Sequence, residues 1–328
     1  MSRPDENQPQ RHYGCLTLPY LCPMQKIRGW VLATFILTFL VIIAGGVVRT
    51  TQSGMGCPDW PKCFGSWIPP TNAADLPANF EQYLKKQDID HTFNVWHTWI
   101  EYINRLLGAL LGLFAVIQTA LLFFKRREQR SAFRLSLAFL IVVILTGLFG
   151  AIVVKLNLAH LSISVHLFFA LLLLQLQLAL WLNLRGKLAS LAVPAKHRHL
   201  LLLLLGVLLV QFVLGTMVRM YIDDVSKQLL YQQREKWLAD IPVSFIVHRS
   251  FSWAVLLFTF FVSWQLYKQP NIKTKAGWLL FWVVMNMVAG IVLFYANMPA
   301  IAQPLHLLLA TAAVTQTVSL WLRTKSNG

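Results

Sequence analysis

Long apolar stretches alternate along the chain with short charged segments. Eight of the stretches are long enough to cross about 30 Å of hydrocarbon as helices, at roughly 1.5 Å per residue. A helix bonds its backbone polar groups internally, which a lipid environment requires. The sequence therefore predicts an all-α polytopic membrane protein. The predicted transmembrane helices cover residues 30–48, 99–124, 135–155, 160–182, 200–218, 245–267, 278–296 and 302–322.

The eight predicted helices divide into two similar halves. Long connections at 49–98 and 219–244 follow the first and fifth helices, whereas the third and seventh helices are followed by short turns. We predict two pseudo-symmetric four-helix bundles at 30–185 and 200–328, preceded by a leader at 1–29 and joined by a linker at 186–199. The repeat is expected to be parallel, with its axis along the membrane normal. The matching motifs are Val48-Arg49 with Val218-Arg219, Asn104-Arg105 with His248-Arg249, Gly150 with Gly290, and His166 with His306.

The charge of the chain is explained by membrane topology. Only 13% of the 328 residues are charged, yet the net charge is +16, and such a basic balance would suggest nucleic acid in a soluble protein. With the N-terminus inside, the inner segments hold 18 of the 29 Lys and Arg residues and 3 of the 13 acids. This asymmetry predicts that both termini are cytoplasmic. Because the charge is dispersed over several membrane-proximal segments, we expect contact with membrane lipid and no nucleic-acid partner.

Histidines recur at matching places in the two halves. Ionisable side chains are costly in a bilayer and therefore indicate function. His248 and His306 lie on the sixth and eighth predicted helices, and His166 lies at the matching position on the fourth. Two facing histidines give a six-coordinate heme iron that suits electron transfer. The alternative is that each histidine only bonds a carbonyl near the interface; the recurrence favours heme ligands.

Charged residues accompany these positions. Arg105 and Arg249 directly follow the ligand-type positions. An arginine there can bind a heme propionate through its planar fork, or it can reach toward the lipid headgroups. Glu101 lies four residues before Arg105 and so shares its helix face. The spacing alone favours Glu101 as a structural partner of Arg105 over a role in proton management.

Two cysteines bracket a short loop, Cys57-Pro-Asp-Trp-Pro-Lys-Cys63. A disulfide is permitted if this loop faces the periplasm or the cell exterior, and a bond in so small a loop would be exchangeable. Metal binding fits less well, because no third and fourth ligand lies close by in the sequence.

These residues together resemble a known family. The segment Gly45-Gly-Val-Val-Arg-Thr-Thr-Gln-Ser-Gly-Met-Gly-Cys-Pro-Asp-Trp-Pro-Lys-Cys-Phe-Gly65 resembles the first span and the cysteine-bearing outer loop of heme A synthases. Trp99-Ile-Glu-Tyr-Ile-Asn-Arg105 is similar to the second-span motif of that family, in which a Glu is followed by His-Arg. His166, His248-Arg249 and His306 match its remaining histidine positions, so the resemblance covers all eight predicted helices.

The resemblance implies an oxidoreductase of heme biosynthesis in a bacterial cytoplasmic membrane. Such an enzyme converts heme O to heme A by oxidising the methyl group at porphyrin carbon 8 to a formyl group. The resemblance also implies a heme b ligated by His248 and His306 beside Arg249, and a redox role for the cysteine pair in some members. Heme O would bind the first half at His166, Asn104 and Arg105, with Glu101 catalytic. A heme O synthase is a candidate partner; the electron-transfer partner and homo-oligomerisation are left open.

One departure from the family concerns the first half. Asn104 replaces a histidine, and because an amide is a poor iron ligand, His166 alone would leave the substrate iron five-coordinate or bound to water. The first half keeps an acid at Glu101, whereas the second has Phe245 at the matching position. This asymmetry favours one catalytic half and one electron-transfer half. The alternatives are a non-catalytic b-type cytochrome that passes electrons and a heme transporter.

Overall fold

The computed structural model describes residues 21–85 and 93–327, and its long helices confirm the all-α polytopic prediction. Within these residues eight helices are long and apolar enough to span a membrane. They are α1 (Leu21–Thr50), α3 (Val95–Phe124), α4 (Arg130–Lys155), α5 (His160–Leu184), α6 (Ala195–Gln228), α7 (Val243–Tyr267), α8 (Lys273–Tyr295) and α9 (Ala302–Arg323). The shorter elements are η1 (Ser53–Met55), η2 (Ala73–Asp75), α2 (Glu81–Leu84), η3 (Arg234–Lys236), β1 (Leu191–Pro194) and β2 (Thr324–Asn327).

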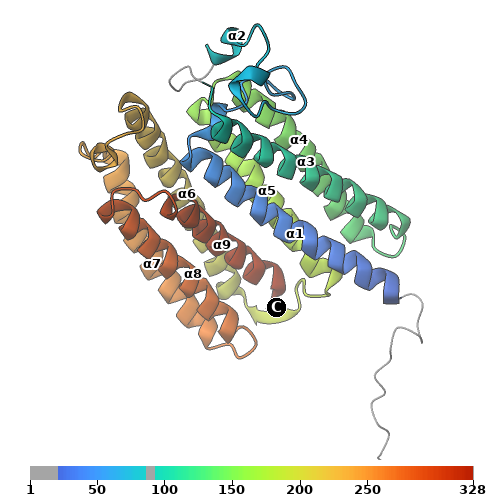
Figure 1. Ribbon diagram of the computed structural model, residues 1–328. Coiled ribbons are helices and arrows are strands. Elements are labelled where there is room, and N and C mark those ends of the chain that lie inside the picture. The colour runs from blue at the N-terminus through green and yellow to red at the C-terminus, as the bar shows by residue number, and fades with distance from the viewer. Residues whose placement is uncertain (1–20, 86–92, 328) are drawn as a thin grey trace, which may run out of the picture.

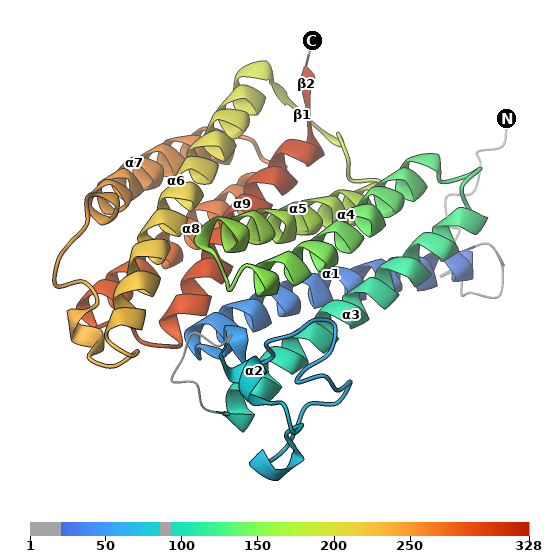
Figure 2. The same ribbon diagram turned by 90° about the horizontal axis from the view of Figure 1, so that it is seen from above.

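The long helices form two groups of four, as Figures 1 and 2 show. In the first half α1 packs against α3 and α5, and α4 packs against both of these helices. In the second half the contacts have the same cyclic order: α6 packs against α7 and α9, and α8 packs against both of these helices. The halves meet mainly where α9 lies against α1 and α5. This arrangement agrees with the predicted pair of four-helix bundles.

The two ends of the molecule differ. At one end, here called the loop end, the segment 51–85 with α2 covers the first half (Figure 1). At the opposite end, the tail end, β1 pairs in parallel with β2, and Arg198 donates to the backbone oxygen of Thr324 at 2.6 Å. The segment predicted as a linker, 186–199, therefore contains a strand and the first turn of α6. Of the predicted leader, residues 1–20 lie outside the described residues.

The internal repeat is visible in the turns at the loop end. The backbone N–H of Leu158 bonds the carbonyl of Val153 after α4, at 2.9 Å. After α8 the N–H of Met298 bonds the carbonyl of Leu293, also at 2.9 Å, so that the pattern recurs 140 residues later. Both turns use two successive residues in the left-handed region, which L side chains rarely adopt. These residues are Asn157 and Leu158 in the first half and Asn297 and Met298 in the second.

Repeat-related residues also meet at the junction of the halves. Gln175 Nε2 on α5 donates to Thr315 Oγ1 on α9 at 3.2 Å, and the two positions are 140 residues apart. A contact between equivalent positions is expected beside a pseudo-two-fold axis, because the axis relates each residue to the other. The junction of α5 and α9 is therefore close to the axis of the repeat.

Helix α6 is longer than the apolar pattern predicts. The predicted helix ends at 218, but α6 continues to Gln228. The additional turns are charged, and their charges are partnered. Asp223 pairs with Arg49 of α1 and, at 3.0 Å, with Arg219 of its own helix, while the next residue, Asp224, bonds His160 of α5 at 2.7 Å. The predicted helix ended too early because hydropathy does not take ion pairs between side chains into account. These ion pairs allow the charged turns of α6 to continue and to contact the first half.

The shared carboxylate of Asp223 should stabilise the junction. We expect Asp223→Ala to lower the free energy of unfolding by about 2 kcal/mol, because Arg49 and Arg219 lose their charged acceptor in a largely buried place. Thermal unfolding of the detergent-solubilised protein measures the effect. Asp224→Ala is the matched control on the same helix, since Asp224 is more exposed and surface pairs contribute little. Equal loss in both variants would contradict this account of the junction.

Candidate functional site

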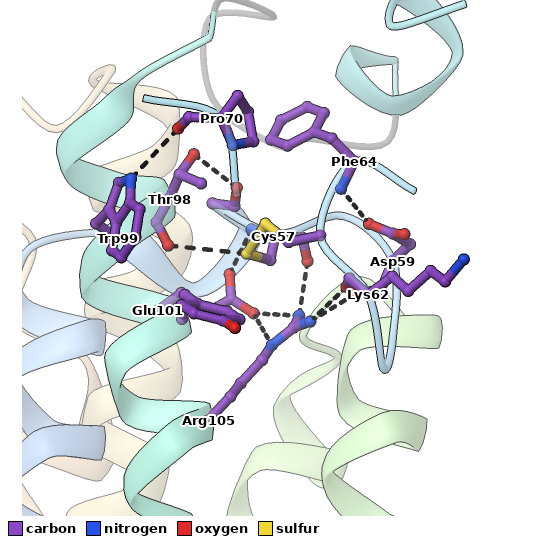
Figure 3. Close-up of a disulfide and its surroundings, with 12 residues drawn as sticks. Cys57, Asp59, Lys62, Phe64, Pro70, Thr98, Trp99, Glu101 and Arg105 are labelled. Atoms are coloured by element: carbon purple, nitrogen blue, oxygen red, sulfur yellow. Dashed lines mark hydrogen bonds and ion pairs between the residues drawn. A yellow bond between two sulfur atoms is a disulfide. The ribbon is translucent and has the colours of Figure 1, made fainter. Parts of the chain in front are cut away.

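Glu101 lies at the centre of a polar cluster at the loop end of the first half (Figure 3). It is in the second turn of α3 and only 4% exposed. Its Oε2 accepts a hydrogen bond from the backbone N–H of Cys57 at 2.8 Å, and its Oε1 pairs with Arg105 Nη2 at 2.5 Å. A buried carboxylate is tolerated when it is paired and hydrogen-bonded. The pairing expected from the four-residue spacing is thus present, with a loop amide added.

Arg105 connects α3 to the cysteine-bearing loop. Its Nε and Nη2 donate to Glu101 Oε1 at 3.1 and 2.5 Å, and Nη2 also donates to the carbonyl of Cys57 at 2.7 Å. Its Nη1 donates to the carbonyls of Asp59 and Lys62 at 2.6 and 3.0 Å. These bonds engage all the nitrogens of the guanidinium within the chain. A heme propionate at Arg105 would have to share or replace them, so that role stays a prediction.

The loop approaches α3 so closely that Gly56 has no room for a side chain. A Cβ at Gly56 would lie 2.3 Å from the backbone oxygen of His97. The carbonyl of Gly56 accepts a hydrogen bond from Thr98 Oγ1 at 2.9 Å. Asn94 caps the start of α3 by accepting from the N–H of Trp96 at 2.9 Å, which fixes this turn of the helix. The loop is therefore held by both the side chains and the backbone of α3.

Cys57 and Cys63 lie close enough to each other for a disulfide. Their Cα atoms are 4.7 Å apart, and both residues are completely buried in a small apolar cluster with Phe64. Within the loop, Asp59 accepts from the N–H groups of Phe64 and Gly65 at 2.7 and 2.9 Å. The sequence identified the cysteine pair and Glu101 separately. It did not show that the amide of Cys57 bonds Glu101, because nothing in the spacing predicts that contact.

In the second half, His248 of α7 faces His306 of α9. Their ring centres are 6.4 Å apart and the rings are nearly perpendicular, at 80°. A metal held between two imidazoles by bonds of about 2 Å places the ring centres roughly 6 Å apart. His306 Nδ1 lies 3.0 Å from the backbone oxygen of Asn286, which favours a proton on Nδ1 and leaves Nε2 as the ligating nitrogen. The pair therefore fits the ligand set of a heme iron.

Each of the three histidines packs against a glycine of the neighbouring helix. A Cβ at Gly215 or Gly290 would lie 3.3 Å from Cε1 of His248 or His306, respectively. A Cβ at Gly150 would lie 3.5 Å from Cε1 of His166. The glycines give each ring space against a helix backbone and so fix its place. The sequence carried a signal for two of them, since Gly150 and Gly290 match in the repeat, but it did not assign them a role.

The remaining predicted residues are placed less tightly. Arg249 is exposed, with its guanidinium 5.9 Å from the ring centre of Phe245. The side-chain oxygen of Asn104 is buried and without a hydrogen-bond partner among the described residues. The structure thus brings together Glu101, Arg105 and the cysteine pair in one half and His248 and His306 in the other. It does not show a ligand role for any of them.

The fold and the site define a polytopic membrane protein of two pseudo-symmetric four-helix halves, with histidines and a buried acid toward the loop end. Residues 28–318 match the model of a family described as cytochrome oxidase assembly protein, COX15-CtaA. The chain therefore belongs to the COX15-CtaA family. The match begins within α1 and ends within α9, so it includes part of each of these helices and all of the long helices between them.

Individual relatives carry the name heme A synthase. The one from Bradyrhizobium diazoefficiens is 26% identical, over 90% of this chain and 91% of its own length. That of Flavobacterium johnsoniae is 23% identical, over 88% of this chain and 96% of its own length. The match to the Shewanella oneidensis relative, at 29% identity, covers 48% of this chain and spans about half of that protein, 46% of its length.

The close approach at Gly56 leads to a testable prediction. We expect Gly56→Ala to lower the free energy of unfolding by about 2 kcal/mol, because the new methyl group meets backbone atoms that cannot move aside. Thermal unfolding and the accessibility of Cys57 and Cys63 to a thiol reagent after mild reduction measure the effect. Gly54→Ala is the matched control, since its Cβ meets only the end of the flexible Leu158 side chain. A stability equal to wild type would show that the loop is not held against α3.

Proposed function

We propose that this protein is a heme A synthase, which oxidises the methyl group at carbon 8 of heme O to a formyl group. The observation that carries the proposal is the similarity to two relatives of that name over about 90% of the chain. The facing histidines of the second half support it, because they suit a heme iron. With water as the source of the formyl oxygen, the oxidation releases four protons and four electrons for each methyl group, so the proposal includes an electron acceptor.

In this proposal the second half holds a heme b. His248 and His306 would hold its iron, and Gly215 and Gly290 keep both rings in place. A heme held by two imidazoles would supply the transfer of single electrons. Arg249, one residue after His248, is near enough in sequence to bind a propionate, and its exposed side chain is free to move toward one.

The first half is proposed to bind the substrate, heme O, with His166 as a ligand to its iron and Asn104 and Arg105 beside it. Glu101 is the catalytic group, because it is the buried acid of the cluster and lies one turn from Asn104. The loop amide of Cys57 and the guanidinium of Arg105 fix the direction of its carboxylate. We propose that Cys57 and Cys63 form a disulfide, which keeps the loop in the conformation that presents this amide.

The asymmetry of the halves favours the synthase over the alternatives. A cytochrome that only passes electrons has no need of the buried acid and its positioned carboxylate in the first half. A heme transporter would be expected to interrupt its helices near the membrane centre, whereas the described spans are single helices. Neither alternative accounts for the similarity to two heme A synthases over about 90% of the chain.

The protein is an integral membrane protein, and we place it in a bacterial cytoplasmic membrane with both termini cytoplasmic. The first turns of α1 and the strand β2 are both at the tail end of the molecule (Figure 1), which is compatible with this placement. The charge asymmetry selects the cytoplasm for that side. A heme O synthase is a proposed partner, since heme O is apolar and would pass most readily between membrane proteins.

The heme b assignment predicts the loss of a spectrum. We expect His248→Ala or His306→Ala to abolish the low-spin b-type absorption of the purified protein, because each removes an axial ligand. Gly290→Val should weaken the same absorption by pushing the ring of His306 aside. Gly277→Val on the same helix is the matched control, since no neighbouring atom of the described residues lies within 4 Å of a Cβ built there. An unchanged spectrum in both histidine variants would rule out the assignment.

The catalytic role of Glu101 predicts a separation of heme binding from heme oxidation. In cells supplied with heme O, we expect Glu101→Gln to retain heme b but to accumulate heme O without forming heme A. The amide can still accept from the N–H of Cys57, so the loop should stay in place. Extraction and chromatography of the bound hemes give the yields, and Glu81→Gln, an exposed acid of α2, serves as control. A normal yield of heme A in Glu101→Gln would reduce Glu101 to a structural partner of Arg105.

A further inference from the structure

The two halves differ at one pair of repeat-related positions. In the second half, His248 of α7 lies over Gly215 of α6. The corresponding residues of the first half are Asn104 and Gly45, since the Val-Arg motif aligns α1 with α6 and the motif ending in Arg105 or Arg249 aligns α3 with α7. The first half therefore keeps the glycine but lacks the imidazole that would cover it.

Gly45 and Asn104 both lie close to the apolar core of the first half. Val41 of α1 and Leu107 of α3 each pack against one apolar cluster, and the two helices contact each other. Gly45 lies one helical turn after Val41, and Asn104 lies about one turn before Leu107. The pair is the sequence counterpart of Gly215 and His248.

No side chain covers Gly45. Gly45 is exposed, and nothing among the described residues lies within 4 Å of a Cβ built there, whereas the three other glycines of this kind each meet a histidine ring. The side-chain oxygen of Asn104 is buried and has no hydrogen-bond partner within the described part of the chain. A buried polar atom of this kind is expected to take a small polar partner such as water. Glu101, three residues before Asn104, borders the same helix face.

We infer that the first half is a heme site with an open axial position, which takes water or another small ligand opposite His166. This inference rests on the proposed function, because it assumes that His166 ligates heme O. Asn104 does not bind the iron; its side chain hydrogen-bonds the small ligand that occupies the place of the missing imidazole. The first site thus lacks one of the two imidazoles that close the second site, and it can exchange a ligand that the second site cannot.

Carbon monoxide and imidazole are the probes that test this inference. Full-length protein, purified after co-expression with a heme O source, is supplemented with hemin until no more is bound. We expect one heme per chain to be high-spin, to bind carbon monoxide when reduced, and to become low-spin on addition of imidazole. The second heme should remain low-spin throughout, because both of its axial positions are filled.

Two variants identify the position. Asn104→His should lose carbon monoxide binding and the high-spin signal, because the new imidazole can lie over Gly45 as His248 lies over Gly215. Asn104→Ala should keep both properties, since it removes the hydrogen-bonding amide but leaves the space. The unchanged low-spin spectrum of the second half reports that each variant has folded.

The outcomes separate this inference from the proposed function. Uptake of only one heme per chain, or a second heme that is low-spin and does not bind carbon monoxide, overturns the inference. Equal carbon monoxide binding by wild type and Asn104→His overturns it as well. Formation of heme A is measured in the same samples. If heme A forms but no open position is found, the inference is wrong and the proposed synthase activity is supported. If an open position is found but no heme A forms, the inference is supported and the proposed synthase activity is contradicted.

Discussion

A lipid environment offers no water to a polar group, and this constraint determines where the chain can place its chemistry. The backbone satisfies it by forming eight helices. The largely buried charged side chains Glu101 and Arg105 satisfy it by pairing with each other and with the loop. Glu101 accepts from Arg105 and from the amide of Cys57, while Arg105 donates to three carbonyls of the same loop. A buried acid therefore exists in the first half because the loop and α3 fold onto each other.

The repeat gives both halves the same scaffold, and a few substitutions give them different properties. Three histidines lie against glycines of neighbouring helices in the same manner. At the position that corresponds to His248 the first half has Asn104, and one turn away it has Glu101 where the second half has Phe245. A fixed electron-transfer site and an exchangeable substrate site can thus arise from one duplicated bundle. The shared carboxylate of Asp223 links the two halves, because it pairs with Arg49 of α1 and Arg219 of α6.

Much of this architecture could be predicted from the sequence, because it depends on patterns that hydropathy and spacing record. The eight helices, the repeat and the pairing of Glu101 with Arg105 were predicted in this way. The extension of α6 was not, since a charged helix is stable there only through partners on α1 and α5. The contact of the Cys57 amide with Glu101 and the glycines beneath the histidines were also missed, because they depend on how close two backbones come. Membrane orientation and ligand binding remain predictions, since neither follows from the packing of the chain.

The central claim is that the two halves bind different hemes for different purposes. The most direct measurement is the identity and amount of heme extracted from the wild-type protein after expression with a heme O source. The account predicts heme b at about one per chain, together with heme A or a hydroxylated form of heme O. Heme b alone in both halves, with no oxidised product, would contradict it.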